Sequence, residues 1–155
     1  MKGQKKVLDK LNDLLADELT AINQYMVHSE MCDNWGYHRL HELVEKRAVD
    51  EMKHAEKHIA RILFLEGKPV VSKLRDIHIG AEVPAQIEND RQSEDGAVKS
   101  YNDGIRIAVE LGDSGTRELL EAILKDEEAH IDWLEAQLDQ IRQTGVQNYL
   151  AEQIR

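Results

Sequence analysis

One acidic segment of the sequence occurs twice. Residues 42–54 read ELVEKRAVDEMKH, and residues 118–130, which lie 76 positions later, read ELLEAILKDEEAH. The Glu-x-x-His motif in each copy follows a further glutamate by 33 residues, Glu18 in the first half and Glu94 in the second. A spacing of three residues places a glutamate and a histidine on one face of a helix. The repeat therefore predicts a duplicated helical unit. Each copy places the same kinds of side chain at the same height along the helix axis.

Apolar residues recur at helical spacing in four long stretches of the chain. The one long stretch without a helical period, residues 67–83, is flanked by the two prolines of the sequence. Gly67 followed by Pro69 predicts the end of the preceding helix. Pro84 is compatible with the first turn of the next helix. The sequence predicts four long helices and a short fifth one, at about residues 4–34, 37–66, 84–111, 114–143 and 146–153.

The lengths of the connections restrict how these helices can be arranged. A helix of about 28 residues is about 42 Å long, and an extended connector of about 17 residues reaches about 56 Å. The connector between the second and third helices can therefore run along the whole bundle, whereas the other two connections are tight. Asp113 or Ser114 can cap the fourth helix after the second tight turn. We expect an all-α, ferritin-like four-helix bundle with a long crossover and a short C-terminal fifth helix, in a single domain over residues 1–155.

The duplicated glutamates and histidines are expected inside this bundle. Glu127 shares an apolar helical stripe with Ile123 and Ile131, and within each hairpin the two glutamates are equally far from the tight turn. Four buried carboxylates without partners would be costly. Two divalent cations would neutralise them, and a mixed set of oxygen and nitrogen ligands suits iron or manganese. The candidate metal ligands are Glu18, Glu51, His54, Glu94, Glu127 and His130.

Other interpretations of these residues are also compatible with the sequence. The repeat also fits surface helices that kept their ion pairs after an old duplication. Tyr25 and Tyr101 recur seven residues after the upstream glutamates, and could hydrogen-bond the opposite ligands, carry electrons or simply fill the core. We expect the histidines outside the repeat to face mostly solvent, and these are His28, His38, His41, His58 and His78.

Charge and composition exclude several classes of function. The net charge of −10 disfavours nucleic acids and anionic membranes as partners. Cys32 is the only cysteine, so a single chain has neither an internal disulfide nor a four-cysteine metal site. No apolar run approaches the length of about 18 residues that a membrane helix needs. The start of the chain has no apolar signal region, and we expect a cytoplasmic protein.

The sequence resembles the bacterioferritins over essentially its whole length. The segments that carry the resemblance are MKGxxKVxxxLN, ELTAINQY, DEMKHAEK, RILFLEG, DEEAHIDWLE and NYLAEQI. The resemblance implies that the six candidate ligands form a ferroxidase centre with two iron ions per subunit. It also implies that Glu51 and Glu127 bridge the two irons, while Glu18 with His54 and Glu94 with His130 hold one iron each. One departure is Lys46, which stands where some members have a histidine for an additional iron on the inner surface.

The resemblance also accounts for a break in the repeat. Met52 stands where the second copy has Glu128. A residue next to Glu51 is rotated by about 100° around the helix, so Met52 is expected to point outward. In the family this position is the axial ligand of a haem b shared by two subunits on a two-fold axis. Gap-filling in the core is the ordinary use of a methionine.

We therefore predict iron storage coupled to ferroxidation. Fe(II) is oxidised by oxygen or hydrogen peroxide and stored as a ferric mineral inside a homo-oligomeric shell of 24 subunits built from two-fold dimers. Haem serves iron release, with a small ferredoxin as the reductant. One alternative is a rubrerythrin-like di-iron oxidase or peroxidase that does not store iron, although rubrerythrins carry a four-cysteine iron module. A metal-free structural bundle is the other alternative, and it predicts no bound iron.

Overall fold

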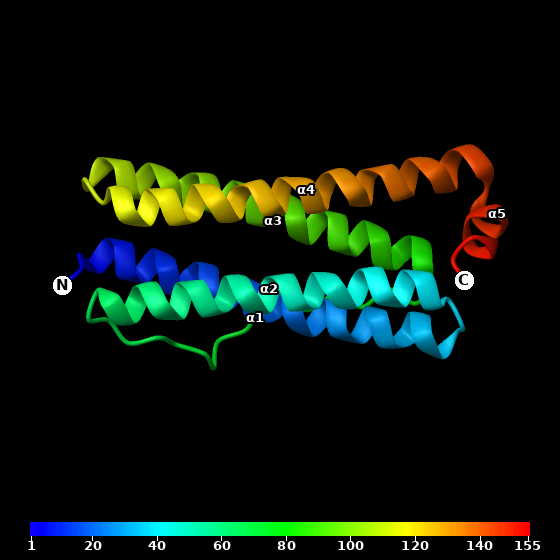
Figure 1. The fold of residues 1–155 in the computed structure, drawn as a ribbon, viewed down its shortest axis with the longest axis horizontal. Coiled ribbons are helices and arrows are strands. Elements are labelled where there is room, and N and C mark those ends of the chain that lie inside the picture. The colour runs from blue at the N-terminus through cyan, green and yellow to red at the C-terminus, as the bar shows by residue number, and fades with distance from the viewer.

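Four long helices and one short helix make up this computed structural model, which describes residues 1–155 (Figure 1). The all-α fold, the long crossover between the second and third helices and the short C-terminal helix are confirmed. The helices are α1 (Lys5–Asn34), α2 (His38–Phe64), α3 (Val83–Glu110), α4 (Ser114–Thr144) and α5 (Val146–Ala151).

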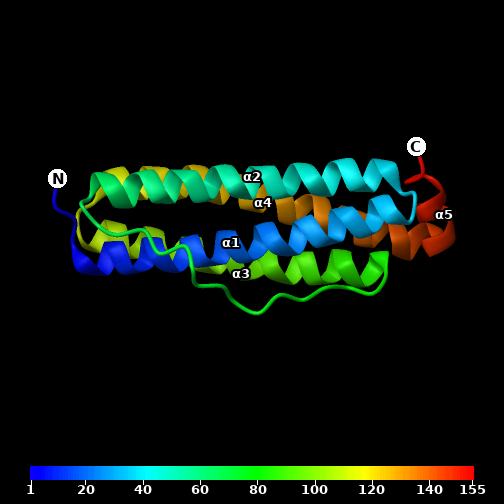
Figure 2. The same ribbon diagram turned by 90° about the horizontal axis from the view of Figure 1, so that it is seen from below.

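The long helices form two antiparallel hairpins that lie side by side. Helix α1 pairs with α2 and α3 pairs with α4, and the two pairs form the two layers seen in Figure 1. Across the layers, α1 lies beside α3 and α2 beside α4 (Figure 2). The N- and C-termini lie at opposite ends of the long axis. None of the helices combines the length and the apolar composition needed to cross a membrane.

The two tight turns use glycine in the same way. Gly36 follows α1 with φ of 83°, and Gly112 follows α3 with φ of 70°. Glycine adopts this left-handed conformation without the steric cost of a Cβ atom. Asp113 then caps α4, because its side chain accepts a hydrogen bond of 3.0 Å from the backbone N–H of Thr116. Pro84 lies in the first turn of α3, as expected.

The end of α2 differs from the sequence prediction. We expected the helix to reach about residue 66, just before Gly67, but it ends at Phe64. The left-handed residue that follows is Glu66, with φ of 59°. The N–H of Gly67 reaches back to the carbonyl of Ile62 at 2.9 Å, and the N–H of Glu66 to that of Leu63 at 3.0 Å. These two bonds form a Schellman motif in which glycine occupies the position after the left-handed one. At Gly67 a Cβ would lie 2.5 Å from a methyl group of Leu8 and 3.1 Å from one of Ile62, so a larger residue there would require these side chains to shift.

The crossover lies along α1 and is bonded to it in chain order. Val70 donates its backbone N–H to Asn12, and His78 donates its own to the Gln24 side chain at 3.1 Å. Further along, the N–H of Gly80 donates to the buried ring of His28 at 3.0 Å. Polar side chains of one helix therefore hold the long connection in place by accepting hydrogen bonds from its backbone (Figure 2).

Two apolar clusters fill the bundle, one towards each end. The first contains Val7, Leu11, Leu14, Leu15, Ala55, Ile62, Leu65, Tyr101, Ile107, Leu120 and Ile123. The second contains Ala21, Tyr25, Cys32, Leu40, Val44, Val83, Ile87, Leu134 and Tyr149. Between them, at mid-height, buried charged side chains replace apolar ones. This polar layer is the candidate functional site.

Candidate metal centre

The six residues singled out by the repeat lie together at the centre of the bundle. Helix α1 supplies Glu18, α2 supplies Glu51 and His54, α3 supplies Glu94, and α4 supplies Glu127 and His130. None of the six is more than 3% exposed to solvent. Glu94 is 2% exposed, although its flanking sequence is less apolar than that of the others. The equal heights expected from the 33-residue spacing are therefore realised in three dimensions.

The six side chains form two overlapping groups. One group is Glu18, Glu51, His54 and Glu127; in the other, Glu94 and His130 join the same Glu51 and Glu127. Within each group one possible ligand atom of each residue lies within 4.8 Å of the others. Two ions bound in these groups would share the carboxylates of Glu51 and Glu127, whereas the remaining residues would each serve one ion.

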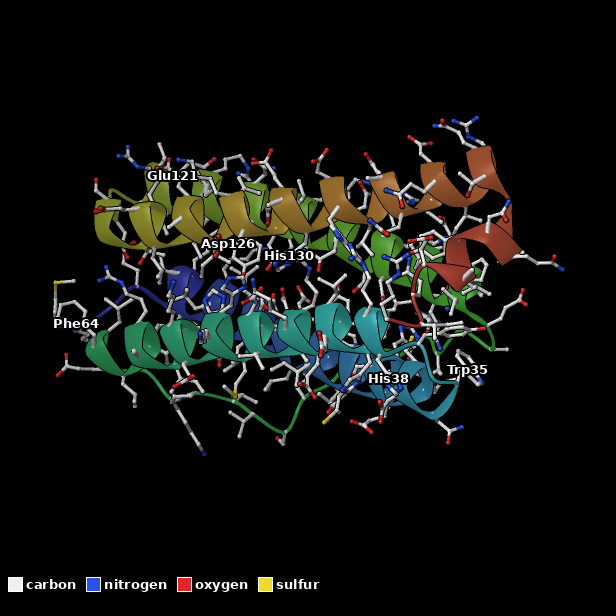
Figure 3. All side chains as sticks on the ribbon, turned by 45° about the vertical axis from the view of Figure 1, so that its right-hand side comes forward. Trp35, His38, Phe64, Glu121, Asp126 and His130 are labelled. Atoms are coloured by element: carbon white, nitrogen blue, oxygen red, sulfur yellow. The ribbon has the colours of Figure 1, made fainter.

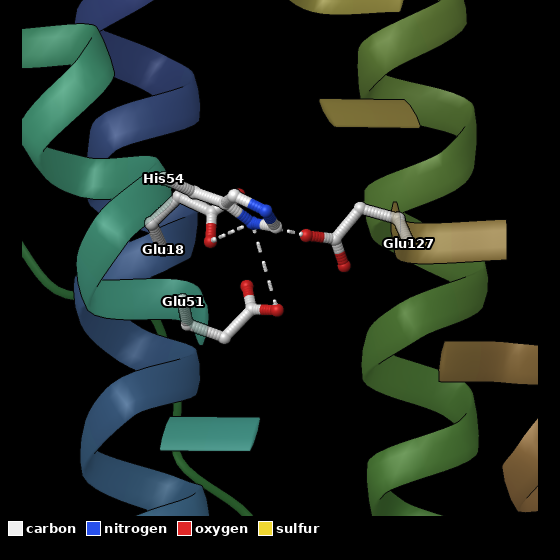
Figure 4. Close-up of side chains that lie close together, drawn as sticks. All are labelled: Glu18, Glu51, His54 and Glu127. Carbon is white, nitrogen blue, oxygen red and sulfur yellow. Dashed lines mark ion pairs between the residues drawn. The ribbon is translucent and has the colours of Figure 1, made fainter. Parts of the chain in front are cut away.

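The imidazole nitrogens face these carboxylates. The Nδ1 atom of His54 lies 2.8 Å from Glu127, 3.7 Å from Glu18 and 3.8 Å from Glu51 (Figure 4). The Nδ1 atom of His130 lies 3.1 Å from Glu51, 3.5 Å from Glu94 and 3.7 Å from Glu127. Each histidine therefore points one nitrogen at three carboxylates that come from different helices.

Most of these polar atoms lack a hydrogen-bond partner. The structure leaves both Nδ1 atoms, one oxygen each of Glu18, Glu51 and Glu94, and both oxygens of Glu127 buried and unpaired. Buried polar groups are almost always paired, and an unpaired one costs about 1–3 kcal/mol. Seven such atoms converging on one place indicate a missing partner that accepts oxygen and nitrogen lone pairs, which is a metal ion. The donor set therefore fits iron or manganese, as the sequence predicted.

The electrostatics point to the same requirement for positive charge. Burial raises the pKa of the Glu18 and Glu94 carboxyls well above the ordinary value. Burial alone would lower the pKa of His130. The neighbouring carboxylates have the larger effect, that of Glu127 above all, and they raise this pKa to about 11. The pKa of His54 is raised in the same way. Without a cation, the cluster neutralises its carboxylates by taking up protons.

Two aspartates orient the histidines from outside the cluster, and sequence reasoning gave them no role. The Nε2 atom of His54 lies 2.9 Å from Asp126, and that of His130 lies 3.4 Å from Asp50. Figure 3 shows Asp126 and His130 directed from α4 towards α2. A metal-binding histidine usually donates its second N–H to such a carboxylate, which fixes the ring. The signal was in the repeat, because an aspartate precedes the glutamate in both copies of the motif.

The two recurring tyrosines contact the candidate ligands of the opposite hairpin. The hydroxyl of Tyr25 donates to Glu94, and the hydroxyl of Tyr101 donates to Glu18. Burial, with the nearby carboxylates, raises the pKa of both hydroxyls well above the ordinary value, so both remain donors. Of the three readings of these tyrosines, the geometry therefore favours hydrogen bonding to the ligands.

Two of the five other histidines contradict the expectation of solvent exposure. His28 and His58 are fully buried, whereas His38 and His78 are exposed and His41 is half-buried. The ring of His28 bonds Asp90 at 2.9 Å. The Nε2 atom of His58 lies 2.6 Å from the Tyr101 hydroxyl, whose single proton goes to Glu18. His58 is therefore the donor to that hydroxyl, and burial lowers its pKa to about 3, which keeps the ring neutral.

Met52 lies outside the cluster, on the exposed side of α2. Its side chain is 46% exposed, and Val49, one turn earlier, is 39% exposed. Exposed apolar side chains also occur on α1 and on the crossover, among them Met26 at 49% and Val71 at 59%. The Met52 thioether is therefore accessible from outside the bundle.

A cavity of about 360 Å³ reaches the cluster from the surface. It is lined by α1, α3 and the crossover, and its walls include the buried carboxylates of Glu18 and Glu94. Nearer the surface its walls include Asp17, with a side chain 31% exposed, and Arg75, with a side chain 41% exposed. A hydrated cation has room to pass along this route.

Comparisons with known proteins show the family to which the chain belongs. Residues 8–144 match the family described as a ferritin-like domain. Bacterioferritin of Brucella melitensis is 41% identical over 149 residues, which cover 96% of this chain and 92% of that protein. Bacterioferritin of Mycolicibacterium paratuberculosis is 43% identical over 152 residues, covering 98% and 96%. Bacterioferritin of Rhodobacter capsulatus is 39% identical over 149 residues, covering 96% and 92%.

A bundle with this crossover and a central set of glutamates and Glu-x-x-His motifs defines the class of ferritin-like carboxylate proteins that bind two metal ions. Within that class, the chain belongs to the bacterioferritin family. Bacterioferritins are ferroxidases that store iron in an oligomeric shell, so iron storage with ferroxidase activity is the function of this chain.

Proposed function

We propose that the central cluster is the ferroxidase centre of this protein and that it binds two Fe(II) ions in each chain. The observation that carries the proposal is the convergence of unpaired, buried oxygen and nitrogen atoms from four helices. Glu51 and Glu127 belong to both groups of ligands and would hold the two ions at a fixed separation. Glu18 with His54 and Glu94 with His130 would complete one ion each.

The charges of the site match its task. Four carboxylates neutralise two Fe(II) ions and favour the higher charge of Fe(III), so the protein stabilises the oxidised product. Two Fe(II) ions supply two electrons, which is the number needed to reduce oxygen to hydrogen peroxide, or hydrogen peroxide to water. Asp126 and Asp50 would keep the histidine rings turned towards the ions. Tyr25 and Tyr101 would hold one oxygen each of Glu94 and Glu18 in place.

The remaining parts of the proposal concern the haem, the assembly, the reductant and the location of the protein. They rest on the resemblance to the family and on the exposed position of Met52. Met52 would ligate haem b, one per pair of subunits, which supplies a route for electrons during iron release. The shell would contain 24 copies of this chain, built from two-fold dimers. A small ferredoxin would be the reductant, and the protein would work in the cytoplasm.

Sedimentation velocity during iron loading tests storage and haem binding together. We expect a boundary at about 427 kDa, which corresponds to 24 chains of 17.8 kDa each. Iron added as Fe(II) in air should travel with this boundary, as should Soret absorbance at one haem per two chains. A small particle that oxidises Fe(II) but retains no iron would instead support the non-storage oxidase.

The variant Met52→Leu separates the two sites. It should lose the Soret absorbance and keep the ferroxidase rate and the particle size, because Met52 does not belong to either group of candidate iron ligands. Unchanged haem content in this variant would exclude Met52 as the axial ligand.

A further inference from the structure

The geometry assigns a regulatory role to Arg75: we propose that its positive charge limits the capture of Fe(II) at the surface end of the cavity that leads to the cluster. The inference rests on the proposed function of that cluster. Arg75 is the only arginine or lysine among the residues that line this cavity. Six carboxylates line it as well, and they are Asp17, Glu18, Glu51, Asp76, Glu94 and Glu127.

Burial shows in which direction a cation would travel. The side chains of Arg75 and Asp17 are 41% and 31% exposed, whereas Glu18 and Glu94 at the other end are 2% exposed. A cation that enters from solvent therefore passes Arg75 before it meets the candidate ligands. The other lining residues with a permanent charge are carboxylates, so Arg75 carries the one fixed repulsive charge on this route.

Arg75 also occupies the carboxylates that would attract Fe(II). Its Nε donates to Asp17 at 3.0 Å, and its Nη2 donates to Asp13 at 3.3 Å. Its backbone N–H donates to the Thr20 hydroxyl at 2.8 Å, which fixes this part of the crossover on α1. The guanidinium is therefore held at the surface end of the cavity. A paired carboxylate offers a passing dication less attraction than a free one.

The expected size of the effect follows from Coulomb's law. A unit charge that acts on a dication across about 10 Å of water changes the local concentration of the dication about four-fold. The effect should fall at high ionic strength, because salt screens charges that lie more than a few ångströms apart.

The test measures the rate of Fe(II) oxidation against Fe(II) concentration in the assembled protein. In Arg75→Gln we expect kcat/KM to rise about four-fold at low salt and to approach the wild-type value at high salt, while the saturating rate stays within about two-fold. Asp17→Asn should lower kcat/KM by a similar factor, because it removes one negative charge from the entrance and leaves Arg75 paired with Asp13 alone. The double variant, which restores the net charge, should be close to wild type.

Two further variants separate charge from structure. Arg75→Lys keeps the charge and loses the forked hydrogen bonds, so it should resemble wild type if charge is what matters. Arg106 is a matched control, because it also pairs with two carboxylates, Asp103 and Glu110, but does not line the cavity. Arg106→Gln should leave kcat/KM unchanged.

The outcomes are distinguishable. A rise in Arg75→Gln that disappears with salt and is absent in Arg75→Lys supports the proposal. An unchanged or lowered kcat/KM in Arg75→Gln, or the same change in Arg75→Lys and Arg106→Gln, overturns it while the ferroxidase function stands. If the wild-type protein does not oxidise Fe(II) at all, the proposed function of the cluster itself is wrong.

Discussion

The two helical hairpins carry the same residue types at corresponding positions whose side chains serve the polar layer. They carry different residues at corresponding positions that point elsewhere. Asp50, Glu51 and His54 on α2 have Asp126, Glu127 and His130 as their counterparts on α4. The glutamates and histidines meet in the cluster, and the aspartates contact the histidines from outside it. On the exposed side, Met52 corresponds to Glu128. The duplicated residues thus remain equal where both copies serve one site, and they diverge where each copy has surroundings of its own.

A second difference lies next to the tyrosines. Position 58, a histidine in the first hairpin, corresponds to Leu134 in the second. His58 donates to Tyr101, whereas Leu134 packs in the apolar cluster that contains Tyr25. One tyrosine therefore has an additional hydrogen bond that the other lacks. The two candidate ion positions have the same kinds of ligand and share two of them, but they differ in the residues behind the ligands.

The largest expected effect comes from the two carboxylates that belong to both groups. Glu51→Gln and Glu127→Gln should each lower the ferroxidase rate by more than about 100-fold, because removal of even an outer partner of a metal ligand costs 10–100-fold. Glu18→Gln and Glu94→Gln should each lower this rate less, and the rates of these two variants should agree within about three-fold. Stopped-flow oxidation of Fe(II) measures all four variants. A difference of more than ten-fold between the ferroxidase rates of Glu18→Gln and Glu94→Gln would contradict the functional equivalence of the two halves.

A smaller effect is expected from the aspartates that orient the histidines. Asp126→Asn should weaken metal binding by about 10-fold or more. Asp50→Asn should have less effect, because its contact with His130 is longer and Asp50 also lies 3.6 Å from Arg47. Calorimetric titration with Co(II) in oxygen-free buffer gives both affinities. A larger loss of affinity in Asp50→Asn than in Asp126→Asn would contradict the argument that the shorter contact matters more.

The difference at position 58 should have little effect on stability. His58→Leu gives the first hairpin the residue of the second. It removes a hydrogen bond worth about 1 kcal/mol but also a buried Nδ1 atom that has no partner. We expect the free energy of unfolding to change by less than about 1 kcal/mol. A drop in thermal stability corresponding to more than about 2 kcal/mol would show that the bond to Tyr101 is a main support of the site.

A change of similarly small size, but stabilising, is expected at the end of α2, where a glutamate takes the left-handed conformation that glycine takes in both tight turns. Glu66→Gly should stabilise the protein by about 1 kcal/mol, because a non-glycine residue in this conformation carries a steric cost of about that size. Thermal unfolding measures it, with Glu110→Gly as the control, since that residue lies at the end of α3 in helical conformation. The control should be destabilised by up to about 1 kcal/mol. Destabilisation by Glu66→Gly would contradict the steric argument.

Much of this could be predicted from the sequence, because counting along helices is reliable over long, uninterrupted periods. The repeat predicted which six residues meet, and the proline positions predicted where the crossover lies. The left-handed conformation of Glu66 could not be predicted, because helices usually end on a left-handed glycine and a glycine stands at the next position. The burial of His28 could not be predicted either, because it depends on Asp90 and Gly80, which lie far from it in sequence. Contacts of this kind follow from packing and have no local period.

The number of metal ions that one chain binds tests the central claim most directly. Equilibrium dialysis against Co(II) in oxygen-free buffer, followed by elemental analysis, should give two ions per chain at saturation. The double variant Glu51→Gln with Glu127→Gln should bind none at the same concentration. Fewer than one ion in the wild-type protein, or two ions retained in the double variant, would contradict the assignment of the duplicated cluster as a two-metal centre.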